Sequence, residues 1–229
     1  MKAGNANVVA SLLSFNGGFV DTAGFLGLQG LFVAHVTGNF VTIGAALVHG
    51  SHGIVGKILA LPEFVLVIAL ARVAGNVLRA RGLPAMKILL AVKVFFLIAF
   101  FGLAVKYGPF PDANTPMALL AGFAGVAAMG MQNAVQRIHM AALPPSTMMT
   151  GSTVQITLDA IDLFTRANPD QRPAVKARFG RLALTISSFA VGCIVCAVLY
   201  VYVGFWCLAG AVIVGTAAAI LQSEDSSQV

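Results

Sequence analysis

The chain has 229 residues, of which 59% are hydrophobic and only 10% are charged, and its mean hydropathy is +0.91. Because soluble domains carry about 25% charged residues, this composition excludes an ordinary soluble protein. The formal net charge of +6 does not indicate nucleic-acid binding, because the basic residues stand between long apolar stretches, as they do in membrane proteins.

The apolar stretches predict membrane-spanning helices in a lipid bilayer. A bilayer core about 30 Å thick needs roughly 20 apolar residues per crossing. Only helices and closed barrels pair all backbone groups internally, and the continuous apolar runs favour helices. We expect six crossings in an all-α bundle: residues 7–31, 57–78, 86–105 and 117–140, a fifth from Arg181 to about 200, and a sixth from Gly204 to about 221.

Two polar breaks interrupt this pattern. Thr37-Gly38-Asn39 follows the first apolar stretch and precedes a short apolar helix that ends near Val48. Thr150-Gly151-Ser152 follows a proline pair and opens a polar helix that ends near Phe164. Counting the two short helices as crossings would give eight spans and a poorer separation of basic residues. We therefore expect them to be re-entrant or broken helices.

With six crossings, the basic residues separate by side. Lys57 and Lys106 fall on one side of the membrane. Basic residues favour the cytoplasmic side, so the other side is expected to be cytoplasmic and to hold both termini. That more basic side holds Lys2, Arg79, Arg81, Lys87, Arg166, Arg172, Lys176, Arg178 and Arg181.

The two breaks also predict an internal repeat. Gly18-x-x-Asp21 precedes the first break, and Gly130-x-x-Asn133 precedes the second. Three crossings per repeat is an odd number, so the repeats must be inverted in the membrane, as in many secondary transporters. The expected divisions are a first repeat at residues 1–107, a loop at 108–116, a second repeat at 117–221 and a disordered cytoplasmic tail at 222–229.

These motifs resemble the YoaK family, known as domain of unknown function 1275. The resemblance rests on Gly18-x-x-Asp21, Thr37-Gly38-Asn39, Gly130-x-x-Asn133 and Thr150-Gly151, and it covers nearly the whole chain. It implies a six-span protein of the bacterial inner membrane. It implies no substrate, so the functional expectations rest on the residues themselves.

Asp21 is the first candidate residue for a function. It lies about 14 positions into the first span, which is near mid-depth at about 1.5 Å per residue. A carboxylate there costs several kcal/mol unless it is paired, hydrated or protonated. It is either a proton or cation site or a structural contact to a neighbouring helix. Arg137, one helical turn after Asn133, is either its ion-pair partner or extends to the cytoplasmic interface.

The breaks predict a polar binding site. A helix that starts inside the membrane exposes unpaired N–H groups and a partial positive charge, which suit an anion. The alternative is that these helix ends cap themselves without a ligand. Ser152 and Gln155 share one helix face with Asp159, and we expect the first two to line an aqueous cavity. The candidate substrate-binding residues are Asp21, His35, Thr37, Asn39, Gln132, Asn133, Arg137, Thr150, Ser152 and Gln155.

The sequence thus favours a small secondary transporter or permease for a polar or anionic solute, with Asp21 as the candidate for proton coupling. The alternative is a non-transporting accessory or scaffold protein, whose polar residues only hold helices together. We expect no enzymatic activity, because nucleotide, nucleophile-elbow and zincin motifs are all missing. No cofactor or metal is expected, because Cys193-x-x-Cys196 has zinc-type spacing but lacks a second ligand pair, and no metal spacing joins the four histidines to the cysteines. A homodimer is compatible with the small size of the chain.

Overall fold

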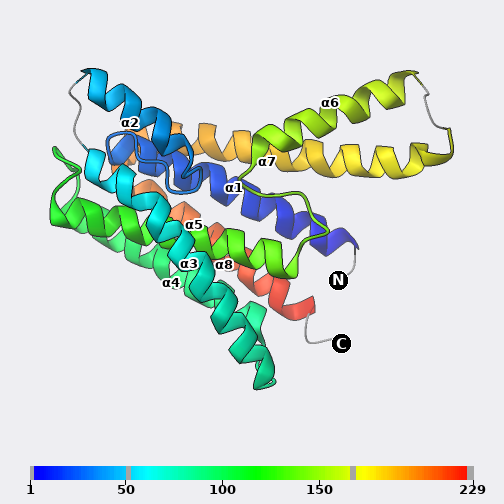
Figure 1. The fold of residues 1–229 in the computed structure, drawn as a ribbon, viewed down its shortest axis with the longest axis horizontal. Helices are drawn as coiled ribbons and strands as arrows, with labels where there is room; N and C mark the ends of the chain where they lie inside the picture. The colour runs from blue at the N-terminus through cyan, green and yellow to red at the C-terminus, as the bar shows by residue number, and fades with distance from the viewer. Residues whose placement is uncertain (1–2, 50–52, 166–168, 226–229) are drawn as a thin grey trace.

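The computed structural model describes residues 3–49, 53–165 and 169–225 of the chain. These residues form an all-α bundle in which two short helices, α2 and α6, stand between long ones (Figure 1). In chain order the elements are α1 (Ala3–Gly27), α2 (Gly38–His49), α3 (Ile54–Ala80), α4 (Ala85–Tyr107), α5 (Pro116–His139), α6 (Met149–Thr165), the 3-10 turn η1 (Pro169–Gln171), α7 (Arg172–Val203), the 3-10 turn η2 (Gly204–Cys207) and α8 (Leu208–Asp225).

The apolar helices make this a multi-pass membrane protein. The last apolar stretch is 51 residues long and contains both α7 and α8, which are separated at Gly204, where φ is +56°. The six predicted crossings fall on α1, α3, α4, α5, α7 and α8. Within the described residues, five stretches are long and apolar enough to cross a membrane: Asn7–Gly27, Ile54–Ala80, Ala85–Tyr107, Pro116–His139 and Arg172–Gln222.

The chain turns back sooner after the first span than the sequence predicted. The helix α1 ends at Gly27 rather than near Leu31, because Gln29 and Gly30 take positive φ values of 52° and 83°. At the other end of the chain, α8 continues to Asp225, and residues 226–229 of the predicted tail lie outside the described part. Lys2 and Arg166, two of the predicted cytoplasmic basic residues, lie outside it as well.

The central helix α1 packs along α7 on one side and against α8 and α5 on others. Glycines let α1 and α7 approach closely, as small residues commonly do between membrane helices. A Cβ atom on Gly18 would lie 2.2 Å from the Phe189 carbonyl oxygen, and one on Gly192 would lie 2.2 Å from the Phe15 carbonyl oxygen. On its α8 side, the buried Asn16 donates from Nδ2 to the Ala211 carbonyl oxygen at 2.6 Å.

The long helices share two ends. The first turn of α1, the last turn of α8 and the α3–α4 turn lie at one end of the bundle, and the α4–α5 loop lies at the other (Figure 1). The helix α2 packs against α3, and α6 packs against α7. The α6–α7 pair extends beyond the rest of the bundle at the end that holds the termini (Figure 1).

Candidate functional site

Asp21 holds the first break in place. Its Oδ1 atom accepts the backbone N–H groups of Val33 at 2.8 Å, Ala34 at 2.7 Å and His35 at 3.3 Å. The carboxylate therefore binds the loop that leads into α2, and it is only 5% exposed. Among the described residues Asp21 makes no ion pair with Arg137, which was one of the two arrangements that the sequence allowed.

Asn39 closes the same loop from the other side. Its Oδ1 accepts the N–H of Phe32 at 2.9 Å, and its Nδ2 donates to the carbonyl oxygen of Phe32 at 2.8 Å. The Asn39 carboxamide thus bonds both the N–H and the C=O of Phe32, in the way that a residue of a neighbouring β-strand bonds both backbone groups of its partner. With both polar atoms engaged and the residue 1% exposed, Asn39 serves the loop rather than a ligand.

This pairing predicts a clear stability effect. We expect Asn39→Asp to destabilise the protein by about 1–3 kcal/mol, because a carboxylate cannot donate to the Phe32 carbonyl and leaves it unpaired. Thermal unfolding in detergent measures the change. Asn76→Asp is the control, since its oxygen can still accept from Arg79 Nη2, which now donates to Asn76 Oδ1 at 2.8 Å. Equal loss of stability in the two variants would contradict the prediction.

Side chains of α5 hold the second break. Thr147 Oγ1 donates to Asn133 Oδ1 at 2.7 Å, and Gln132 Nε2 donates to Ser146 Oγ at 2.9 Å. Gln136, which the sequence did not single out, accepts the Ser146 N–H at 2.9 Å. Since all these groups are engaged at the loop, the polar stripe of α5 fixes where α6 begins.

The two breaks meet at one open cavity of about 530 Å³. Its wall contains the residues just before α2 and the first residues of α6, although 113 positions separate Thr37 from Thr150. Two arginines line it, Arg72 from α3 and Arg137 from α5. The polar side chains in the wall are His35, Thr37, Arg72, Asn133, Arg137, Thr147 and Thr150, and the rest are Ala34, Val36, Phe64, Ile68, Ala134, Ile138, Met148, Met149 and Gly151.

A second cavity of about 390 Å³ lies on the other side of the first break. His35 lines both cavities, so the loop that Asp21 holds separates them. The lining of the second cavity is Asp21, Thr22, Phe25, Phe32, His35, Phe189 and Cys193.

The structure brings five of the ten predicted site residues to the first cavity: His35, Thr37, Asn133, Arg137 and Thr150. Asp21 faces the second cavity. The other four are used inside the fold: Asn39 and Gln132 hold loops, Ser152 is buried with its Oγ 3.4 Å from the Met148 carbonyl oxygen, and Gln155 donates to Asp159.

Ser152 and Gln155, which we expected to line an aqueous cavity, line neither of the two cavities described above. Their helix face packs against α7, where Arg178 Nε donates to Asp159 Oδ2 at 2.9 Å. Gln155 Nε2 donates to Asp159 Oδ1 at 2.8 Å and belongs to the same cluster. The hydrogen bond from Arg178 holds the pKa of Asp159 below its ordinary value. A polar face can be satisfied by a partner helix as well as by water, and the sequence of α6 alone does not distinguish the two.

The sequence reasoning did not place two residues, Arg72 and Lys93, among the candidate site residues. Arg72 in α3 is exposed and lines the first cavity. Lys93 in α4 is fully buried, and its Nζ has no hydrogen-bond partner in the described part of the chain. Lys93 had the same signal as Asp21, a single ionisable residue near the middle of an apolar span.

The fold and these paired breaks define an integral membrane protein with a polar cavity between apolar helices. A family model described as "Protein of unknown function (DUF1275)" matches residues 9–221. The chain belongs to this family, also called the YoaK family, and the predicted resemblance is confirmed. Comparison with curated proteins and with solved structures gives no significant match.

Proposed function

We propose that the protein is a permease for a small organic anion, which binds in the cavity between the two Thr-Gly breaks. One observation carries the proposal: the loop that leads into α2, the first residues of α6, and the residues Arg72 and Arg137 border the same 530 Å³ cavity. The start of each helix carries a partial positive charge, which attracts anions. At α2 the first three N–H groups donate to the carbonyl oxygens of His35, Val36 and Thr37, so this end contributes charge rather than free donors.

The two arginines support an anion more strongly than a neutral solute. Across the described residues the recorded ion pair joins Arg178 to Asp159, so Arg72 and Arg137 have no carboxylate partner there. Guanidinium groups bind carboxylates through two parallel hydrogen bonds. The remaining wall is mostly apolar, with Phe64, Ile68 and Met148 among its residues. This mixture suits an anion with a small hydrocarbon body, and the volume is within the range of small-molecule sites.

An inverted repeat of the two halves is part of the proposal. The helix α1 packs against α7 and α8, as α5 packs against α3 and α4. The helix α2 packs against α3, as α6 packs against α7. Exchanging the first four helices with the last four therefore reproduces these contacts. Such symmetry is what two repeats related by an axis in the membrane plane would produce.

The breaks add support for the repeat. Asp21 and Asn133, which the Gly-x-x-Asp and Gly-x-x-Asn motifs align, each bind the loop that follows their own helix through Oδ1. In this proposal α2 and α6 are half-helices that begin near mid-depth, and α1, α3, α4, α5, α7 and α8 cross the membrane. The repeats are those predicted at residues 1–107 and 117–221.

The orientation is also proposed. The turn after α3 and the start of α7 carry the basic residues Arg79, Arg81, Arg172 and Lys176. Because basic residues favour the cytoplasm, we place this end there, in a bacterial inner membrane with both termini inside. The proposal includes no enzymatic step. A homodimer stays a prediction, and so does proton coupling through Asp21, which lies outside the anion cavity.

Filling the cavity tests the function. The purified chain would be placed in proteoliposomes and the uptake of radiolabelled succinate, which stays charged near neutral pH, would be followed. A Cβ added at Gly151 meets no atom within 4 Å, so Gly151→Leu should fold while its side chain occupies cavity space. We expect uptake to fall at least about tenfold, equivalent to about 1.4 kcal/mol of lost interaction.

Gly44→Leu is the matched control, because Gly44 also has open space around it but does not line the cavity. It should transport like the unaltered protein. If succinate uptake were the same in empty liposomes and in liposomes with the unaltered protein, the permease proposal would be overturned and the scaffold alternative favoured. Equal uptake by the unaltered protein and the Gly151→Leu variant would instead show that transport does not use this cavity.

A further inference from the structure

The second cavity is lined by Asp21, whose carboxylate uses only one of its two oxygens in hydrogen bonds within the described part of the fold. Within the described residues, every hydrogen bond to Asp21 goes to Oδ1, and Oδ2 accepts none. Asp21 also lines the 390 Å³ cavity on the far side of the loop from the anion site. A carboxylate oxygen that faces a cavity with no internal partner is a binding group for a positive charge.

The lining limits which cation fits. Three phenylalanines, Phe25, Phe32 and Phe189, line the cavity together with the carboxylate, and Thr22 adds one hydroxyl oxygen. A metal ion needs several oxygen ligands, and within the described residues no group of three or more His, Cys, Asp or Glu side chains gathers anywhere. A proton alone would need no cavity of this size. Aromatic rings around an acidic group are the surroundings in which alkylated ammonium ions bind.

We propose that this cavity binds a small organic ammonium ion, held by Asp21 Oδ2 and by the rings of Phe25, Phe32 and Phe189. The site is separate from the anion cavity, and the binding of this cation does not depend on the proposed transport function. The cation contributes one positive charge to balance Asp21 inside the apolar bundle, where an unbalanced charge is costly.

The same carboxylate links the two cavities. Asp21 Oδ1 holds the N–H groups of Ala34 and His35, and both residues line the anion cavity. A cation on Oδ2 draws charge from Oδ1 and weakens its hold on this loop. Cation and anion binding are therefore coupled, and each ligand must change the affinity of the other by the same factor. This coupling, unlike the cation site itself, rests on the proposed function.

The test is calorimetric titration of tetramethylammonium chloride into the purified full chain in detergent, with sodium chloride as the reference salt. Tetramethylammonium keeps its charge at every pH, so its binding is not confused with proton uptake. Asp21→Asn retains an oxygen for the loop and removes the charge, and we expect at least about tenfold weaker binding, as for loss of a charged partner. Phe189→Leu leaves the loop hydrogen bonds alone, and we expect about threefold weaker binding through the lost aromatic ring.

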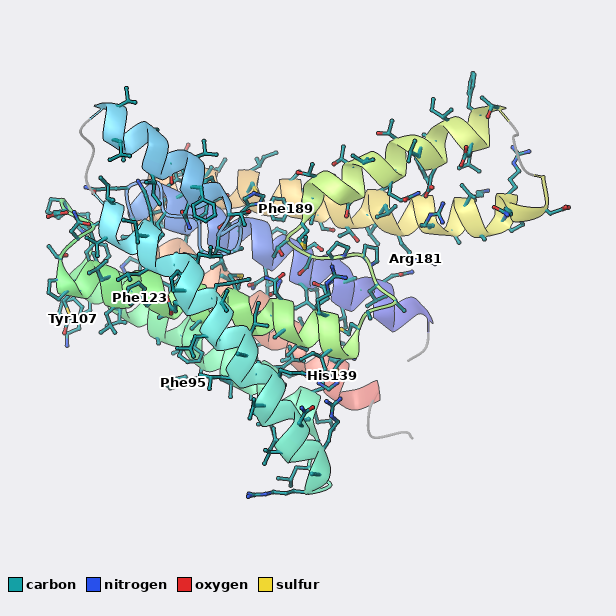
Figure 2. All side chains as sticks on the ribbon, in the orientation of Figure 1. Phe95, Tyr107, Phe123, His139, Arg181 and Phe189 are labelled. Atoms are coloured by element: carbon teal, nitrogen blue, oxygen red, sulfur yellow. The ribbon has the colours of Figure 1, made fainter. Side chains whose placement is uncertain are left out.

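Phe95→Leu is the matched control for the aromatic variant. Phe95 is exposed on α4 and does not line the cavity, and Figure 2 labels it and Phe189 on different sides of the bundle. It should bind tetramethylammonium like the unaltered chain. If Asp21→Asn does not fold, the comparison of Phe189→Leu with Phe95→Leu decides by itself whether tetramethylammonium binds in this cavity.

The outcomes separate the two proposals. Saturable binding of tetramethylammonium that weakens in both cavity variants supports the cation site, whether or not succinate is transported. Heat that sodium chloride reproduces, or binding equal in the unaltered chain and in Asp21→Asn, overturns it, even if succinate uptake persists. Where both ligands bind, tetramethylammonium should shift the dissociation constant of succinate, and an unchanged constant would overturn the coupling.

Discussion

Gly192→Ala should destabilise the protein by about 3 kcal/mol, near the upper end for adding a methyl group to a packed interior. A Cβ at Gly192 would lie 2.2 Å from the backbone carbonyl oxygen of Phe15. Backbone cannot rotate away as a side chain can, so α1 and α7 must separate along their interface. Equilibrium unfolding by denaturant in detergent micelles, with and without the substitution, measures the difference.

Gly180→Ala provides the control in the same helix. Gly180 is exposed near the start of α7, and a Cβ there meets nothing within 4 Å. Because alanine has the higher helix propensity, this variant should be unchanged or stabilised by up to about 1 kcal/mol. If both alanine variants lost stability equally, the close approach of α1 and α7 at Gly192 would be refuted.

The second large effect concerns the two arginines of the anion cavity. The double variant Arg72→Gln, Arg137→Gln should bind succinate at least about 100-fold more weakly, since each hydrogen bond to a charged group contributes about 1.5–3 kcal/mol. Glutamine retains polarity and approximate length but neither the charge nor the two-pronged geometry. Calorimetric titration gives the affinity, and proteoliposome uptake at low succinate should fall in parallel.

Net charge needs its own control in this experiment. Arg81→Gln removes a positive charge from the turn after α3, outside the cavity wall. It should leave succinate affinity within about twofold, because Arg81 is exposed and dissolved salt screens exposed charges outside the cavity. A similar loss of affinity in Arg81→Gln would mean that general positive charge, rather than the cavity, attracts the anion.

The helices were predictable because their signal is local. Apolar runs and flanking glycines or prolines placed α4 and α5 within about two residues of their observed ends, and the Thr-Gly breaks located the starts of α2 and α6. Two boundaries differed more. The helix α7 begins at Arg172, nine residues before the start predicted at Arg181, because its first turns are helical although polar. The apolar run of α1 continues to Leu31, while the turn at Gln29 and Gly30 depends on the loop returning to Asp21, a tertiary contact.

The site was predictable only in part, for a similar reason. The breaks and Arg137 were found because polar residues inside apolar segments need a partner or a ligand. Whether a given polar residue has a protein partner or binds a ligand depends on residues far along the chain. Gln132 reaches Ser146 and the Leu13 carbonyl, and the α6 face reaches Arg178, so neither is free to line a cavity. Arg72 was missed because its role depends on where α3 packs against α5.

The position of α1 has a consequence for how the protein is made. This helix leaves the ribosome before α7 and α8, yet Asn16 donates to Ala211, which is 195 residues later in the chain. At roughly 5–20 residues per second, that interval takes roughly 10–40 s. For most of it, Ser14, Asn16 and Asp21 stand in a helix whose neighbours α7 and α8 have not yet been made. The nascent chain must therefore keep α1 beside the insertion machinery or loosely against α5, and this side of the bundle closes only after α8 has been made.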